Sequence, residues 1–93
     1  MEKDKLQKEL VDKALIEIEK KNIDRLKLVV EDMTTNFKNS AITYLFKANI
    51  HILEKDYEET VSSFKKCLEI APNYGEAHRQ YAEFLRISND IKK

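Results

Sequence analysis

The sequence predicts an all-α domain of about five helices. Two observations indicate this fold class. The 93-residue chain contains one glycine and one proline, whereas an all-β domain requires such turn residues throughout. Its apolar residues recur at helical spacing among strong helix formers such as Leu, Lys, Glu and Ala. The length fits one domain, which we expect to span residues 1–93.

The first two predicted helices are separated by the polar residues 20–22. Basic residues at 20 and 21 suit a helix C-terminus. The first helix has apolar residues every four positions, at Leu6, Leu10, Ala14 and Ile18. The second alternates spacings of three and four, at Ile23, Leu26, Val30, Met33 and Phe37.

The third and fourth helices differ in pattern. The third, from Ala41 to about Lys55, is apolar on more than one side, so it is either covered on two faces or displays one face to a partner. Asp56 opens the fourth helix as its N-cap, in a capping box with Glu59. The buried stripe of the fourth helix is expected at Tyr57, Val61, Phe64 and Leu68.

Pro72 stops the fourth helix, because the residue before a proline disfavours helical geometry. Asn73, with Glu76 three residues later, is the expected N-cap of the fifth helix. That helix is expected to bury Ala77, Tyr81, Phe84 and Leu85, leaving charged residues on its other side.

The chain matches itself at a spacing of 34 residues. Ala14, Ala48 and Ala82 share one register, Asn22 matches Asp56, and other pairs follow the same spacing. Residues 41–74 resemble the tetratricopeptide repeat (TPR), a 34-residue helix–turn–helix unit. Four residues stand at its characteristic aromatic, small, aromatic and terminal proline positions: Tyr44, Ala48, Phe64 and Pro72.

The resemblance implies an array of antiparallel helix hairpins, an α–α superhelix. Repeat 1 covers about residues 7–40, repeat 2 covers 41–74, and a partial third repeat or capping helix covers 75–91. The last helix has the polar outer face of a cap, and a chain cut from a longer array is the alternative. Lys13 and Lys47 stand where the family usually has Leu, and Thr60 replaces a usual alanine, which affects local packing angles.

Composition disfavours several function classes. The 17 basic and 17 acidic residues cancel and are interspersed, so no one-signed patch indicates nucleic acid or a membrane surface. No apolar run approaches the length of a membrane helix, and the N-terminus lacks the apolar region of a signal peptide. These observations, with a single cysteine, favour a cytoplasmic protein.

No catalytic residues, metal ligands or cofactor site are predicted. Catalysis needs a nucleophile or base beside an orienting partner, and the chain has almost no loops to position one. His51 and His78 are interpreted as packing residues, and Cys67 as a buried, inert thiol. We therefore expect that the protein is not an enzyme.

The predicted function is protein–protein interaction. The resemblance implies that the first helix of each repeat lines a concave groove for a peptide or helical segment of a partner. We expect the groove to be apolar at one end and charged at the other. Glu76 adds to the charged residues at the second end. The groove residues are Val11, Leu15, Ile18, Ile42, Leu45, Asn49, Ile52, Arg79, Glu83 and Arg86.

The alternative is self-association. A second copy of the chain could cover the apolar face, making it a homodimer interface instead of a peptide site. The first reading gives an adaptor, chaperone-like subunit or scaffold, and the second gives an oligomerisation domain.

Overall fold

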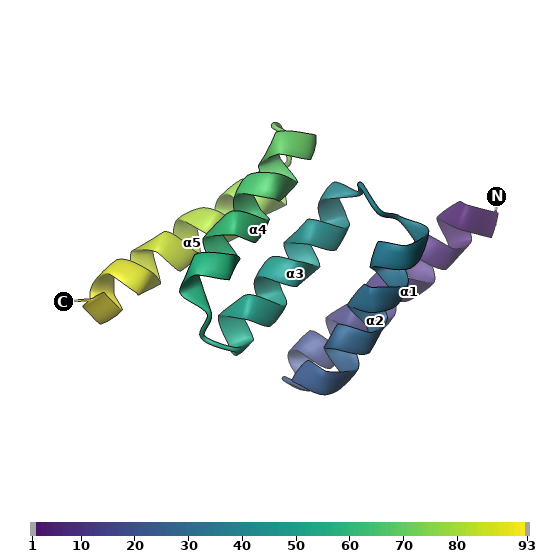
Figure 1. Cartoon of the computed structure of the whole chain (residues 1–93), viewed down its shortest axis with the longest axis horizontal. Helices are drawn as coiled ribbons and strands as arrows, with labels where there is room; N and C mark the ends of the chain where they lie inside the picture. The colour runs from purple at the N-terminus through teal and green to yellow at the C-terminus, as the bar shows by residue number, and fades with distance from the viewer. Residues whose placement is uncertain (1, 93) are drawn as a thin grey trace.

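The structure, a computed structural model, forms five helices in the described part of the chain (Figure 1). It describes the backbone of residues 2–92, and the side chains of residue 2 and residues 4–89. The helices are α1 (Glu2–Glu19), α2 (Ile23–Asn36), α3 (Ala41–Leu53), α4 (Tyr57–Ile70) and α5 (Gly75–Lys92). The all-α prediction is confirmed.

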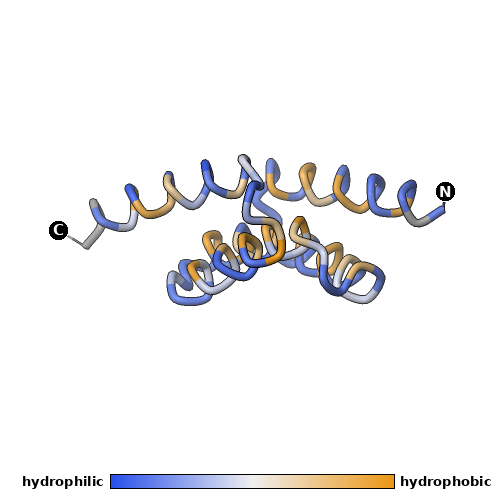
Figure 2. The backbone as a smooth tube through the Cα atoms, turned by 90° about the horizontal axis from the view of Figure 1, so that it is seen from above, coloured by the Kyte–Doolittle hydropathy of each residue, from blue (hydrophilic) through white to orange (hydrophobic). Residues whose placement is uncertain are grey.

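The helices stand in a row of antiparallel hairpins (Figure 1). α1 pairs with α2, α3 pairs with α4, and α5 packs against α4. The Cα trace measures 48 × 29 × 17 Å, so the molecule is about two helix layers thick. Seen from above, α1 and α5 lie on one side and the three central helices on the other (Figure 2). The chain is therefore an array and not a closed bundle.

The two hairpin turns, between α1 and α2 and between α3 and α4, share the same backbone hydrogen bonds and similar φ angles. Lys21 and Lys55, which are 34 residues apart in the sequence, have positive φ angles of 56° and 61°. The next N–H in each turn reaches back to a helix carbonyl, from Asn22 to Glu17 and from Asp56 to His51, both at 2.9 Å. This pattern is the Schellman motif that commonly ends a helix. The repeat seen in the sequence is thus present in the backbone geometry.

The helix caps agree with the sequence only in part. Asp56 accepts a hydrogen bond from the backbone N–H of Glu59 at 3.3 Å, as predicted. The reciprocal half of the capping box is replaced, because the Asp56 N–H donates to the carbonyl of the preceding helix. The cap expected at Asn73 is wrong: α5 begins at Gly75, and the N–H of His78 bonds to the Tyr74 carbonyl at 3.1 Å.

Two hydrophobic clusters form the core, and α3 contributes to both. Phe46 and Ile50 face the first hairpin, whereas Leu45 and Ala48 face α4 and α5. The N-terminal core comprises Leu10, Ala14, Leu26, Val30, Met33, Phe46 and Ile50. The C-terminal core comprises Leu45, Ala48, Phe64, Cys67, Ala77 and Phe84. Of the two possibilities for the apolar third helix, coverage on two faces is the one observed.

Aromatic packing fixes α5 against the second hairpin. Phe64 is fully buried, and its ring stacks on Tyr81 with centroids 5.1 Å apart. Phe84 is buried beside it, with centroids 6.2 Å apart. Leu85, which the sequence placed in the core, is 40% exposed, because the buried stripe of α5 runs through Ala77 and Phe84.

The departures from the repeat pattern are accommodated locally. Thr60 is fully buried, and its hydroxyl donates to the Asp56 carbonyl at 2.8 Å, so the polar atom is satisfied within the helix. The Lys47 ammonium lies 4.8 Å from the centroid of the Tyr44 ring. α5 covers the whole range 75–91 assigned to the partial third repeat, although the side chains of Asp90 and Ile91 lie outside the described residues.

Candidate functional site

A pocket of 340 Å³ opens between the C-terminal part of α3, the turn that follows it, and α5. We call it the α3–α5 pocket. Four large side chains form its apolar part: Ile52, Tyr57, Phe84 and Ile87. The polar part of the lining comprises Asn49, Lys55, Arg79, Gln80, Glu83 and Ser88. An apolar cavity with a few convergent polar groups is the usual form of a binding site.

Hydrogen bonds hold the polar side of this pocket in place. The Asn49 amide donates to the Leu45 carbonyl at 2.9 Å and to the Gln80 side-chain oxygen at 3.3 Å, which joins α3 to α5. The Gln80 amide in turn donates to Glu76 at 2.9 Å, and Arg79 also pairs with Glu76. The polar groups are therefore ordered before any partner arrives.

Hydrogen bonds from arginine side chains lower the pKa of both carboxyls near the pocket, Glu76 and Glu83. Arg79, and then Gln80, donates to Glu76 and lowers its pKa to about 2. Arg86 donates to Glu83 at 2.5 Å and lowers the pKa of that carboxyl from its ordinary value. Among its described side chains, the exposed face of α5 thus presents two neutralised ion pairs, Arg79 with Glu76 and Arg86 with Glu83.

The structure brings together four of the ten residues expected in the groove. Asn49, Ile52, Arg79 and Glu83 all line the α3–α5 pocket. Leu45 does not reach the surface: it is 4% exposed and belongs to the C-terminal core. The sequence placed it in the groove because it lies on the same helix face as Ile52, but it is buried in the C-terminal core with Ala77 and Phe84 of α5.

The other five groove residues lie outside this pocket. Val11, Ile18 and Ile42 are half-buried and pack against the N-terminal core. Leu15 is 53% exposed on α1, and Arg86 is exposed on α5 in its pair with Glu83. The apolar end of the predicted groove is therefore largely used for packing between the first hairpin and α3.

Several lining residues were not among the expected groove residues. Tyr57 and Phe84 were assigned to the core, and both do contact it while also facing the pocket. Ile87 was overlooked, although it follows Glu83 by four positions and Arg79 by eight and so shares their helix face. This spacing could therefore have identified Ile87 as a residue of the same helix face from the sequence.

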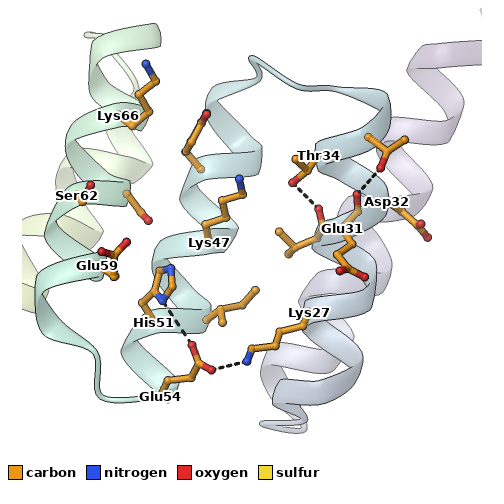
Figure 3. Close-up of a pocket in the computed structure, with 15 residues that line it drawn as sticks. Lys27, Glu31, Asp32, Thr34, Lys47, His51, Glu54, Glu59, Ser62 and Lys66 are labelled. Atoms are coloured by element: carbon orange, nitrogen blue, oxygen red, sulfur yellow. Dashed lines mark hydrogen bonds and ion pairs between the residues drawn. The ribbon is translucent and has the colours of Figure 1, made fainter.

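A second and larger opening, of 970 Å³, lies across α2, α3 and α4 (Figure 3). We call it the α2–α4 cleft. Glu54 lies at one end, where it pairs with Lys27 of α2 at 2.5 Å and approaches the His51 Nδ1 at 3.4 Å. Hydrogen bonding to Lys27 lowers the pKa of Glu54 and raises that of Lys27. Both acidic and basic side chains line this cleft.

The arrangement of nucleophiles and bases offers no catalytic constellation among the described side chains. His51 is oriented toward Glu54, but no described hydrogen bond joins it to a serine or cysteine. Burial raises the pKa of the Cys67 thiol, which keeps it protonated and unreactive. No group of three metal-ligating side chains occurs among the residues described.

His78 differs from its predicted role as a packing residue. It is exposed, and its Nε2 lies 2.7 Å from the Pro72 carbonyl, across the turn that precedes α5. Both histidines were predicted to be packing residues, but only His51 lies between helices, as one of the residues lining the α2–α4 cleft.

Comparison with known proteins gives one family assignment. No curated protein and no solved structure matches the chain. No helix of the described residues is both long and apolar enough to cross a membrane. The TPR-like architecture agrees with a family model, Iml2/Tetratricopeptide repeat protein 39, that matches residues 8–84. The chain therefore belongs to the Iml2/Tetratricopeptide repeat protein 39 family, a TPR-type family.

Proposed function

We propose that this domain is a non-catalytic protein-interaction module that binds a segment of another protein in the α3–α5 pocket. The observation that supports it most is the pairing of an apolar cavity with an ordered polar side on an exposed face of a TPR-type array. TPR-type domains generally mediate protein–protein interaction.

The chemistry of the pocket defines the segment that fits. Ile52, Phe84 and Ile87 offer a place for one apolar side chain, which gains free energy by leaving water. Asn49 and Gln80 present amide groups that can pair with the main chain or polar side chains of the segment. Since the ion pairs on α5 are neutralised, strong charge on the ligand is not required.

Peptide selection tests this proposal. A random peptide library is screened against the 93-residue chain, and the affinity of each selected peptide is measured by fluorescence anisotropy. Ile87, 45% exposed at the pocket, is replaced by Asp, and we expect the affinity to fall about tenfold or more, which corresponds to about 1.4 kcal/mol.

Leu85 provides a matched control on the same helix. It is 40% exposed and does not line the α3–α5 pocket, so Leu85→Asp should leave peptide affinity within about twofold of the parent. Circular dichroism establishes that both variants are folded. Equal affinity of the selected peptides for Ile87→Asp and for the parent chain would contradict the proposal.

A further inference from the structure

A third opening lies on the outer side of the first hairpin, at the end of the row opposite α5 (Figure 1). We call this surface the N-terminal edge. α1 and α2 each line it with residues at positions i, i+3 and i+4, so that each helix presents one face to it. These residues are Lys13, Ile16 and Glu17 on α1, and Arg25, Leu28 and Val29 on α2.

The N-terminal edge exposes apolar side chains. Ile16 is 48% exposed and Leu28 is 61% exposed, and both line a hollow of 560 Å³ together with Val29. Apolar side chains gathered in one hollow mark a contact surface more often than scattered ones do.

The 34-residue register shows which element covers the equivalent surface of the second hairpin. The equivalents of the edge residues all line the α2–α4 cleft: Lys47, Ile50, His51, Glu59, Ser62 and Ser63. Val30 of α2 packs there in one core cluster with Ile50, which is 6% exposed, against 48% for its equivalent Ile16. The N-terminal edge thus has the form of a face on which a helix lies as α2 does, and no helix of the described residues covers it.

The N-terminal edge is more apolar than the surface that it repeats. Leu28 and Val29 take the register positions of Ser62 and Ser63. Chain connectivity holds α2 beside the second hairpin, so that contact needs little affinity of its own. A surface that takes up a separate molecule depends instead on the apolar area that it removes from water. The added apolar side chains therefore favour a separate helix as the occupant.

The charges at the N-terminal edge are reversed relative to the second hairpin. Lys27 of α2 pairs with Glu54 at 2.5 Å, and Glu59 lines the same cleft. The residues equivalent to these two acids are Lys20 and Arg25, both exposed and neither in an ion pair with a carboxylate of the described residues. The turns that contain Lys20 and Glu54 share the same backbone hydrogen bonds. A helix docked as α2 docks would therefore bring its equivalent of Lys27 to a basic surface, which favours an acid at that position.

This chain's own helix of that type does not match the edge. α2 carries Lys27 at the contact position, where it would meet cations instead of acids. In each copy, α2 is also already packed between α1 and α3. The charge pattern thus favours a different protein over a second copy.

We infer that the N-terminal edge binds an amphipathic, acidic helix of another protein, in the position that α2 takes on the second hairpin. The apolar stripe of this helix covers Ile16 and Leu28, and its acidic residue faces Arg25 and Lys20. The contact uses residues distinct from the α3–α5 pocket, so it stands independently of the proposed peptide binding.

Two helical peptides test the inference. Both have the sequence of residues 22–37, one with the native Lys27 and one with Lys27→Glu, and a side-chain staple keeps each helical because an isolated helix of this length is marginal in water. Their affinity for the 93-residue chain is measured by fluorescence anisotropy at chain concentrations up to about 1 mM. We expect the acidic peptide to bind about fivefold or more tighter than the native one.

Variants of the chain test both parts of the contact. Leu28→Ser, which introduces the residue found at the equivalent position 62, should weaken binding of the acidic peptide about fivefold or more. Lys20→Glu combined with Arg25→Glu restores the two acids of the second hairpin, so this double variant should prefer the native peptide to the acidic one.

Matched controls carry the same chemical changes away from the edge. Leu85→Ser alters another exposed leucine, and Lys38→Glu combined with Lys65→Glu reverses two other exposed cations. Both should bind the acidic peptide as the parent does, and circular dichroism shows whether each variant is folded.

Equal affinity of the parent chain for the two peptides would overturn the inference. So would binding that survives Leu28→Ser but is lost in Ile87→Asp, since the helix would then occupy the α3–α5 pocket. A parent chain that dimerises in sedimentation equilibrium, and no longer does so in Leu28→Ser, would assign the edge to a second copy. Each result can be told apart from a failure of the proposed peptide binding, which is measured with library-selected peptides.

Discussion

At the scale of single residues, the two hairpin turns contain backbone strain. Lys21 and Lys55 have φ angles of 56° and 61°, a left-handed conformation that costs a residue with a Cβ roughly 1 kcal/mol. Glycine adopts it without that cost, although glycine also gains more freedom in the unfolded chain. The net effect of glycine at these positions should therefore be favourable but small.

Lys21→Gly should raise the free energy of unfolding by about 0.5 kcal/mol, as measured by urea denaturation. The preceding residue, Lys20, is the control, because its φ is not positive and glycine there offers only added freedom in the unfolded state. Lys20→Gly should be neutral or destabilising. A Lys21→Gly variant less stable than the parent would show that the lysine side chain stabilises this turn.

At the scale of helices, the packing of α5 depends on Phe64. Its ring is fully buried in α4 and contacts Tyr81 and Phe84 of α5. Phe64→Ala should lower the free energy of unfolding by about 3–5 kcal/mol, because it removes buried area and leaves a cavity between three helices. Phe37→Ala is the comparison, and its half-buried ring at the margin of the N-terminal core should cost distinctly less. Equal losses in the two variants would contradict this assignment.

A single ion pair between charged side chains links the first hairpin to the second in the described structure. Lys27 of α2 pairs with Glu54, just after α3, and the pKa of Glu54 lies below its ordinary value of 4.5. A carboxyl whose pKa is lowered by folding stabilises the folded state above pH 4.5 and loses that contribution as the pH falls through the folded pKa.

Glu54→Gln should therefore be slightly less stable than the parent at neutral pH, and the two should converge as the pH falls below 4.5. Thermal unfolding followed by circular dichroism across this range measures the difference. The exposed Glu58, replaced by Gln, controls for the general effect of removing an acid. A stability difference between Glu54→Gln and the parent that persists unchanged in acid would assign the effect to something other than this pair.

The sequence predicted where these helices lie better than it predicted which of their faces are buried. Breaks in the apolar pattern located the turns. The capping residues Asn22 and Asp56 were also predictable, because they cap their helices by purely local hydrogen bonds. The exposure of Leu85 and the burial of Leu45 depend on how α5 packs against the second hairpin. That packing is set by side chains distant in sequence, such as Phe64 and Phe84, and helical periodicity alone does not encode it.

At the scale of the whole molecule, the chain is a row of hairpins that is about two helices thick. Such an array has long exposed faces as well as ends. The α3–α5 pocket lies on one of these faces, where it has an ordered polar side and lies beside neutralised ion pairs.

The site proposed for partner binding was only partly predictable. Asn49, Ile52, Arg79 and Glu83 follow from the repeat register, which places them on the first helices of successive repeats. Ile87 shares that face, but its equivalents at a spacing of 34, Leu53 and Glu19, were not among the expected groove residues. The pocket itself arises because Tyr57 and Phe84 leave a gap between α3 and α5, and packing gaps cannot be read from a sequence.

Nuclear magnetic resonance gives the most direct test of the binding site. Backbone amide spectra of the 93-residue chain are recorded during titration with a selected peptide. Shift changes should centre on Asn49, Ile52, Gln80 and Ile87, and leave the amides of the α2–α4 cleft nearly unchanged. Changes centred instead on Thr35, Ser62 and Lys66 in that cleft would contradict binding between α3 and α5.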